Sequence, residues 1–150
     1  MDFSQLQAWL HVAIVHIPVI IAPVSLFLLT KGKRNESADF LRLGHTLVLL
    51  VTLTSAVAYF TGPTTVDWWQ EKVQFDQEAV EAHGLWGRIS FTLLTLAGVG
   101  SLMTIIGELQ EEKPHPLIFS FVWWLLFTGV ISLIWTAHQG GLLRRPELAF

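Results

Sequence analysis

The sequence predicts an all-α membrane protein, an antiparallel bundle of four transmembrane helices, and three observations support this prediction. First, 52% of the 150 residues are hydrophobic and 14% are charged, whereas an ordinary soluble domain carries roughly 25% charged residues. Second, the apolar residues gather in four runs, each long enough for the roughly 20 helical residues that cross a hydrocarbon layer of about 30 Å. Third, the links between these runs are short, which favours neighbouring helices of opposite direction.

The chain is expected to form one domain, 1–150, in which every span is helical because lipid offers the backbone no hydrogen-bond partner. In the first span, Pro18 and Pro23 each remove a backbone hydrogen bond, so we expect a kink near His16. The link 63–82 carries apolar residues at helical spacing and predicts a short amphipathic helix on the membrane surface. The four spans are expected at 9–30, 43–62, 84–107 and 117–138.

The charges of the links favour one orientation in the inner, cytoplasmic membrane of a bacterium. A narrow majority of the Lys and Arg residues lies on the side of the first link, 31–42, and links rich in these residues stay on the cytoplasmic side. We therefore expect a multi-pass protein with both termini on the periplasmic, outer side. The tryptophans expected near this outer boundary are Trp9, Trp68, Trp69, Trp86 and Trp135.

The composition also excludes several kinds of chemistry. The absence of cysteine rules out disulfides, thiolate metal sites, iron–sulfur clusters and covalent haem attachment through C-x-x-C-H. A formal net charge of −3 argues against a nucleic-acid partner. No acidic residue lies inside a predicted span, which argues against a carboxylate relay for protons or cations.

Histidines are the candidate functional residues, because imidazoles inside a membrane need partners. The predicted topology gathers His11, His16, His83 and His138 in the outer half of the bundle. His83 shares a helix face with small residues such as Gly87, which let a neighbouring helix or a flat macrocycle approach closely. His11 and His16 point about 140° apart around one helix, so they cannot both face the same neighbour.

This arrangement predicts a haem b, which is flat and hydrophobic and is bound by imidazoles without cysteine. His16 and His83 are the preferred axial metal ligands, His11 and His138 are the reserves, and Arg88 is a partner for the propionates. Two axial histidines leave no open iron position, which favours electron transfer over oxygen chemistry. A quinone beside the haem is compatible with this prediction, although no residue identifies its pocket. The alternative is that each histidine hydrogen-bonds a carbonyl or a hydroxyl instead.

Short motifs resemble those of a widespread group of small bacterial four-helix membrane proteins known as domain of unknown function 2231. "HVAIVHIP" (11–18) resembles the family's H-P-x-x-V-H-F-P opening, and "EAHGLWG" is similar to its third-helix histidine, which lands on His83. Gly140-Gly141 matches the Gly-Gly that closes its fourth helix, whereas the family's terminal Y-x-H-G is missing. The resemblance implies a four-helix membrane fold and marks His16 and His83 as positions of interest. No activity is established for this family, so the resemblance implies none for this chain.

The expected function is that of a b-type cytochrome-like membrane subunit that relays electrons through a bis-histidine haem near the outer membrane face. Its expected partners are membrane lipids, other subunits of a larger respiratory or photosynthetic complex, and a soluble or membrane-bound electron carrier. So small a chain, with little outside its spans, is not expected to catalyse a reaction by itself. The alternatives are a cofactor-free structural or assembly subunit and, third, a small transporter.

Overall fold

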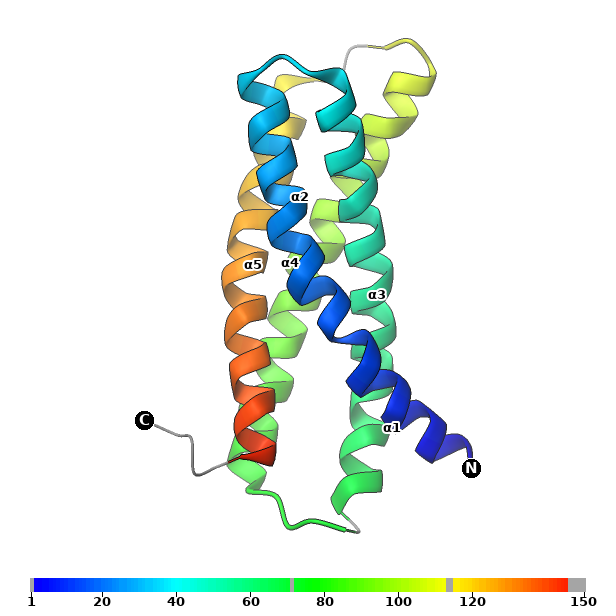
Figure 1. The fold of residues 1–150 in the computed structure, drawn as a ribbon, viewed down its shortest axis with the longest axis vertical. Helices are drawn as coiled ribbons and strands as arrows, with labels where there is room; N and C mark the ends of the chain where they lie inside the picture. Colours follow the sequence, from blue (N-terminus) through cyan, green and yellow to red (C-terminus); the bar gives the residue numbers. More distant parts are fainter. Residues whose placement is uncertain (1, 71, 113–114, 146–150) are drawn as a thin grey trace.

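A computed structural model describes residues 2–70, 72–112 and 115–145. Within these ranges the regular secondary structure is helical, and short links join the helices. Its helices are α1 (Phe3–Ile14), α2 (His16–Arg34), α3 (Ala38–Gln70), α4 (Gln77–Leu109) and α5 (Pro116–Arg144) (Figure 1). The first two are the halves of one interrupted span. The described chain therefore has four helical stretches that are long and apolar enough to cross a membrane, which confirms the predicted all-α class with four spans.

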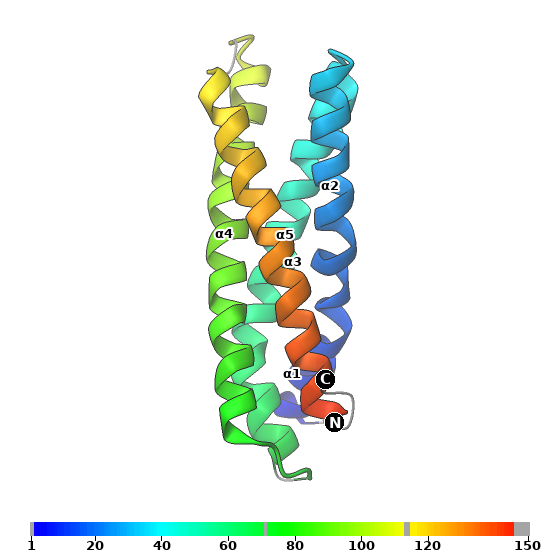
Figure 2. The ribbon, with the colours of Figure 1, turned by 90° about the vertical axis from the view of Figure 1, so that its left-hand side faces the viewer.

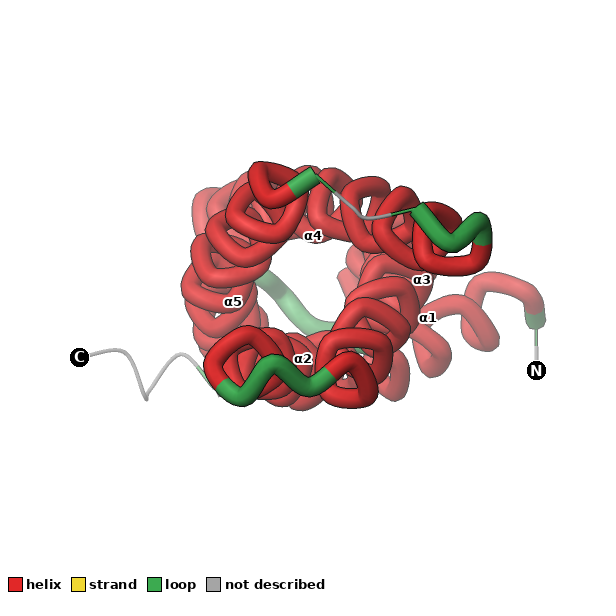
Figure 3. Tube along the Cα trace, turned by 90° about the horizontal axis from the view of Figure 1, so that it is seen from above, coloured by secondary structure: helices red, strands yellow, loops and turns green. Residues whose placement is uncertain are grey.

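Successive spans of the bundle run in opposite directions, so the helices begin and end at its two ends (Figures 1 and 2). We call the end where α1 begins and α5 finishes the terminal end, and the opposite end the distal end. Seen from above, α2, α3, α4 and α5 form a ring, and α1 lies outside it (Figure 3). Helix α1 packs mainly on α3, and α5 packs on α4 and, to a lesser extent, on α2.

The first span is interrupted where the sequence predicts a kink. Helix α1 ends at Ile14, Val15 separates the two helices, and α2 begins at His16. Pro18 lacks the N–H that would bond the carbonyl of Ile14, which weakens the helix at this point. The interruption lets α1 lean away from α2 and lie across α3 instead (Figure 1).

The predicted surface helix between the second and third spans is wrong. Helix α3 continues through Pro63 to Gln70, and α4 begins at Gln77. The sequence 63–82 is therefore divided between the end of one long helix, a short link and the first turns of the next. Asp76 marks the start of α4, because its side chain caps this helix by accepting a hydrogen bond of 3.1 Å from the backbone N–H of Glu78.

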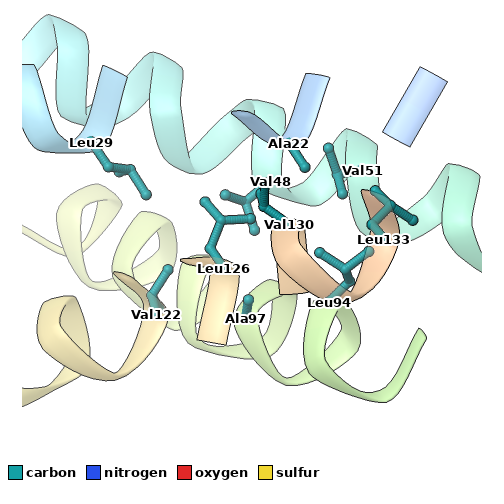
Figure 4. Close-up of a cluster of buried hydrophobic side chains, with 10 residues drawn as sticks. All are labelled: Ala22, Leu29, Val48, Val51, Leu94, Ala97, Val122, Leu126, Val130 and Leu133. Carbon is teal, nitrogen blue, oxygen red and sulfur yellow. The ribbon is translucent and has the colours of Figure 1, made fainter. Parts of the chain in front are cut away.

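The apolar core lies among α2, α3, α4 and α5 (Figure 4). Small residues let α3 and α4 come close: a Cβ on Gly98 would overlap the side chain of Thr52. The Thr52 hydroxyl is 2.9 Å from the carbonyl oxygen of Leu94 and so links the two helices. The buried core residues are Ala22, Leu29, Val48, Val51, Leu94, Ala97, Val122, Leu126, Val130 and Leu133.

Large apolar side chains cover the outside of the bundle, whereas small polar ones lie inside. Leu53 and Phe60 are 67% and 69% exposed, while Ser90 and Ser101 are 2% and 0% exposed. Exposed apolar surface on this scale is unfavourable in water and is typical of helices that face lipid. The distribution is consistent with a multi-pass membrane protein.

Candidate functional site

His11 lies on α1 with its half-buried ring against α3. Its Nδ1 atom is 2.8 Å from the carbonyl oxygen of Ala58 and 3.3 Å from the hydroxyl oxygen of Thr61. Because a carbonyl oxygen only accepts, the Nδ1–H of His11 donates to Ala58. The proton is thereby fixed on Nδ1, and the Nε2 atom of the neutral ring keeps its lone pair.

His83 repeats this arrangement on the other pair of helices. It lies half-buried on α4, and its Nδ1 atom is 3.1 Å from the carbonyl oxygen of Thr136 on α5. A Cβ on Gly140 would be 2.9 Å from Cε1 of the His83 ring, so the absence of a side chain at this glycine makes room for the imidazole. The Nδ1–H donates to the carbonyl, and Nε2 again keeps its lone pair.

Both imidazoles lie towards the terminal end, because α1 and α4 both begin there. They approach from different helix pairs, His11 from α1 packed on α3 and His83 from α4 packed on α5. Neither Nε2 atom has a hydrogen-bond partner within the described ranges. The terminal end therefore carries two imidazoles whose Nε2 lone pairs are not used by the described residues.

Two other glycines near this pair differ from Gly140, whose missing side chain makes room for the His83 ring. A Cβ on Gly87 would meet its nearest neighbour, Cγ2 of Thr136, at 4.0 Å, and a Cβ on Gly62 would lie 3.5 Å from Cε1 of His11. Both distances are ordinary van der Waals contacts, so tight helix packing does not demand glycine at either position. Ser55, on α3, adds a buried hydroxyl that has no hydrogen-bond partner. Two unpaired Nε2 atoms and nearby small residues are the features of this end that suit a flat group bound by imidazoles.

His16 and His138 lie in different surroundings from this pair. His16 is exposed on α2 and makes no hydrogen bond with any residue of the described chain. His138 is exposed on α5, where its ring centre is 5.6 Å from that of Trp135. The helix break thus turns His11 toward α3 and leaves His16 outside, in keeping with the expectation that they face different neighbours.

Arg88, the predicted propionate partner, is exposed and lines a shallow groove on α4 with Glu78 and Glu81. This groove lies on another face of α4 than the His83 contact with α5, because the two residues are about 140° apart around the helix. The structure therefore does not bring the Arg88 guanidinium together with the two half-buried imidazoles.

The two remaining histidines have structural partners. His45 is 3% exposed, and its Nδ1 atom is 3.0 Å from the hydroxyl oxygen of Ser101. His115 caps α5, accepting at Nδ1 from the backbone N–H of Leu117. Among the described residues, no three His, Asp or Glu side chains gather as a metal site. A pair of imidazoles is what the terminal end provides.

The carbonyls of Ala58 and Thr136 are the functional groups that sequence reasoning missed. A backbone acceptor has no signature of its own in a sequence. The neighbouring glycines, Gly62 and Gly140, were a possible signal because each lies against an imidazole ring. Each is also four residues from the carbonyl that its histidine bonds.

Comparisons of the chain with models of known protein families, with curated proteins and with solved structures found no match. The resemblance of the 11–18 segment to the four-helix membrane family therefore stays a prediction.

Proposed function

We propose that the terminal end of the bundle holds haem b between the imidazoles of His11 and His83, and that the protein relays electrons as a b-type cytochrome-like membrane subunit. One observation supports the proposal: His11 and His83 lie towards the same end of the bundle, and each donates its Nδ1–H to a carbonyl of a neighbouring helix. Histidines that bind metals almost always donate their second nitrogen in this way, which fixes the tautomer and the orientation of the ring.

His11 replaces His16 as the proposed partner of His83 for two reasons. Its ring is half-buried, whereas that of His16 is exposed, and a haem ligand must reach the interior. Its proton is fixed on Nδ1 by Ala58, whereas nothing in the described chain orients the His16 ring. The pair of His16 and His83 stays the alternative prediction.

The chain's own residues would position, orient and shield the group. Ala58 and Thr136 would keep the two Nδ1 protons in place, and Gly62 and Gly87, which lack side chains, would let a flat ring system approach the helices closely. Arg88 is exposed on another face of α4 than the contact of His83 with α5, and its role as a partner of the propionates stays a prediction from the sequence. Haem b with two axial imidazoles supplies reversible one-electron oxidation and reduction of iron.

The proposal also includes the orientation of the protein in the membrane and its partners in electron transfer. The terminal end would face the periplasm of a bacterial inner membrane, because the first link carries much of the positive charge. Electrons would enter and leave through other subunits of a respiratory or photosynthetic complex, or through an electron carrier or quinone. The chain offers little structure outside its spans for a complete reaction.

Absorption spectra of the purified protein test this function. Cells supplied with haem precursor should yield a coloured protein with a Soret band and, after reduction with dithionite, a sharp α band. His11→Ala and His83→Ala should each remove or strongly change these bands. His16→Ala and His138→Ala are matched controls that should leave them intact.

The outcomes separate the alternatives. A spectrum lost in His16→Ala and kept in His11→Ala would restore the pair predicted from the sequence. A colourless wild-type protein would contradict the proposal and favour a cofactor-free structural subunit, in which both imidazoles merely tie helices together through Ala58 and Thr136. Solute flux into vesicles would test the transporter alternative.

A further inference from the structure

A groove at the distal end, far along the bundle from the two histidines, combines positive charge with aromatic surface. It lies between α2 and α5 and has a volume of about 190 Å³. Lys33 and Arg34 line it from the last turn of α2, and Phe119, Trp123 and Trp124 line it from α5. The proposed haem function uses none of these residues.

The cations of this groove are free to meet an anion. Lys33 and Arg34 are exposed, and within the described ranges neither forms an ion pair with a carboxylate. The Nζ atom of Lys33 lies 5.5 Å from the centre of the Phe119 ring, so its charge is held over the mouth of the groove by a cation–π contact.

The aromatic wall is fixed in position by its own contacts. The indole N–H of Trp123 donates to the hydroxyl of Thr30 at 2.9 Å, which joins α5 to α2. The Trp123 ring also stacks on Phe127, with centres 5.3 Å apart and planes 7° apart. Trp124 is 60% exposed beside it. The groove thus has a rigid apolar wall below a positively charged rim.

We propose that this groove binds an anionic phospholipid, with the phosphate against Lys33 and Arg34 and an acyl chain along the aromatic wall. Basic pockets between transmembrane helices at the cytoplasmic side commonly hold anionic head groups. A phospholipid fits better than free phosphate, because free phosphate would leave the apolar wall of Trp123 and Trp124 unused. The proposal rests on the membrane location of the helices and does not depend on haem.

Native mass spectrometry of the full chain in detergent, titrated with phosphatidylglycerol or phosphatidylcholine of identical acyl chains, tests this site. The wild-type protein should bind phosphatidylglycerol about thirtyfold more tightly, since each of the two basic residues near an anionic head group contributes roughly fivefold. Lys33→Gln with Arg34→Gln should remove the preference. Lys33→Gln alone should weaken the preference, and Lys31→Gln is its matched control, because it removes the same single charge from the same turn of α2 without lining the groove.

One further variant and one competition experiment test the aromatic wall and the choice of a phospholipid over free phosphate. Trp124→Ala should weaken both lipids alike, because it removes apolar wall and leaves the charge in place. Excess inorganic phosphate should not displace phosphatidylglycerol. Equal affinity of the wild-type protein for the two lipids, equal loss in Lys31→Gln, or displacement by phosphate would each overturn the proposal. Helicity by circular dichroism confirms that every variant is folded, and none of these results depends on bound haem.

Discussion

The imidazoles at the two ends of the bundle have different hydrogen-bond partners. In the distal half, the His45 ring is 3% exposed and bonds the hydroxyl of Ser101, in a region where a Cβ on Gly98 would overlap Thr52. At the terminal end, His11 and His83 bond carbonyls instead. A hydroxyl can donate or accept, so it leaves either tautomer open, whereas a carbonyl fixes the proton on Nδ1. Burial alone therefore does not distinguish a ligand from a structural histidine.

The glycines mark the same difference between the two ends. A Cβ on Gly44 would be 2.8 Å from Cδ2 of Leu29, which shows that α2 and α3 touch at this glycine. A Cβ on Gly87, at the terminal end, would meet nothing nearer than 4.0 Å. Glycine at the distal end serves close helix packing. At the terminal end Gly140 also serves a close contact, with the His83 ring, whereas Gly87 does not, and the following changes test the role of Gly87.

The largest effect is expected for Gly87→Leu. The new side chain should occupy the space that we assign to the haem, so haem content should fall more than tenfold while the protein remains helical. Haem per chain, measured from the absorption of purified protein, gives the result. The matched control is Gly84→Leu, an exposed position where a Cβ would meet nothing within 4 Å. Equal haem content in both variants would contradict an open space at Gly87.

Gly98→Ala should act on stability instead of on the cofactor. The added methyl group would overlap Thr52 and disturb its bond to Leu94, at a cost of about 1–3 kcal/mol in the free energy of unfolding. Unfolding in mixed micelles with increasing denaturing detergent measures this loss. Haem content per folded chain should be unchanged, and a variant as stable as the wild type would show that α3 and α4 are not in close contact here.

His45→Phe should have a smaller effect on stability and none on the spectrum. The ring volume is nearly kept, but the bond to Ser101 is lost, which costs about 1 kcal/mol. The same unfolding measurement detects the change, and the Soret and α bands should stay in place. Loss of those bands would indicate that the cofactor lies in the distal half, and it would contradict a purely structural role for His45.

The smallest effect is expected for Arg42→Gln. This side chain forms a 2.7 Å ion pair with Glu108, but its own exposed fraction is 62%, and water screens such surface pairs. The unfolding midpoint should not shift measurably. A clear destabilisation would mean that this ion pair is far less hydrated than its exposure indicates.

The fold class was predictable because apolar runs of span length leave few alternatives to helices in a membrane. The inward face of the third span was predictable too, since the 3.6-residue period places Ser90, Leu94, Ala97 and Ser101 on one side, and all four are buried. The residues at which the helices begin and end were not predictable, because hydropathy detects only the apolar part of a helix. The polar turns that extend α3 to Gln70 escaped it.

The arrangement of the candidate site was only partly predictable. His83 was identified from its stripe of small residues, and His11 was a reserve. The sequence could not decide between His11 and His16, because the break at Val15 changes the direction of α1. It also could not reveal the carbonyls of Ala58 and Thr136, since main-chain acceptors are positioned only when the helices pack.

Titration of the cofactor-free protein with haemin, followed by absorption, tests the central claim most directly. The wild-type protein should bind one haemin per chain and give the spectrum of a six-coordinate, low-spin haem. The double variant His11→Ala/His83→Ala should lose this binding, whereas His16→Ala/His138→Ala, with the same number of imidazoles removed, should retain it. Absence of binding in the wild-type protein, or equal binding by the two double variants, would contradict the assignment of the terminal end as a haem site.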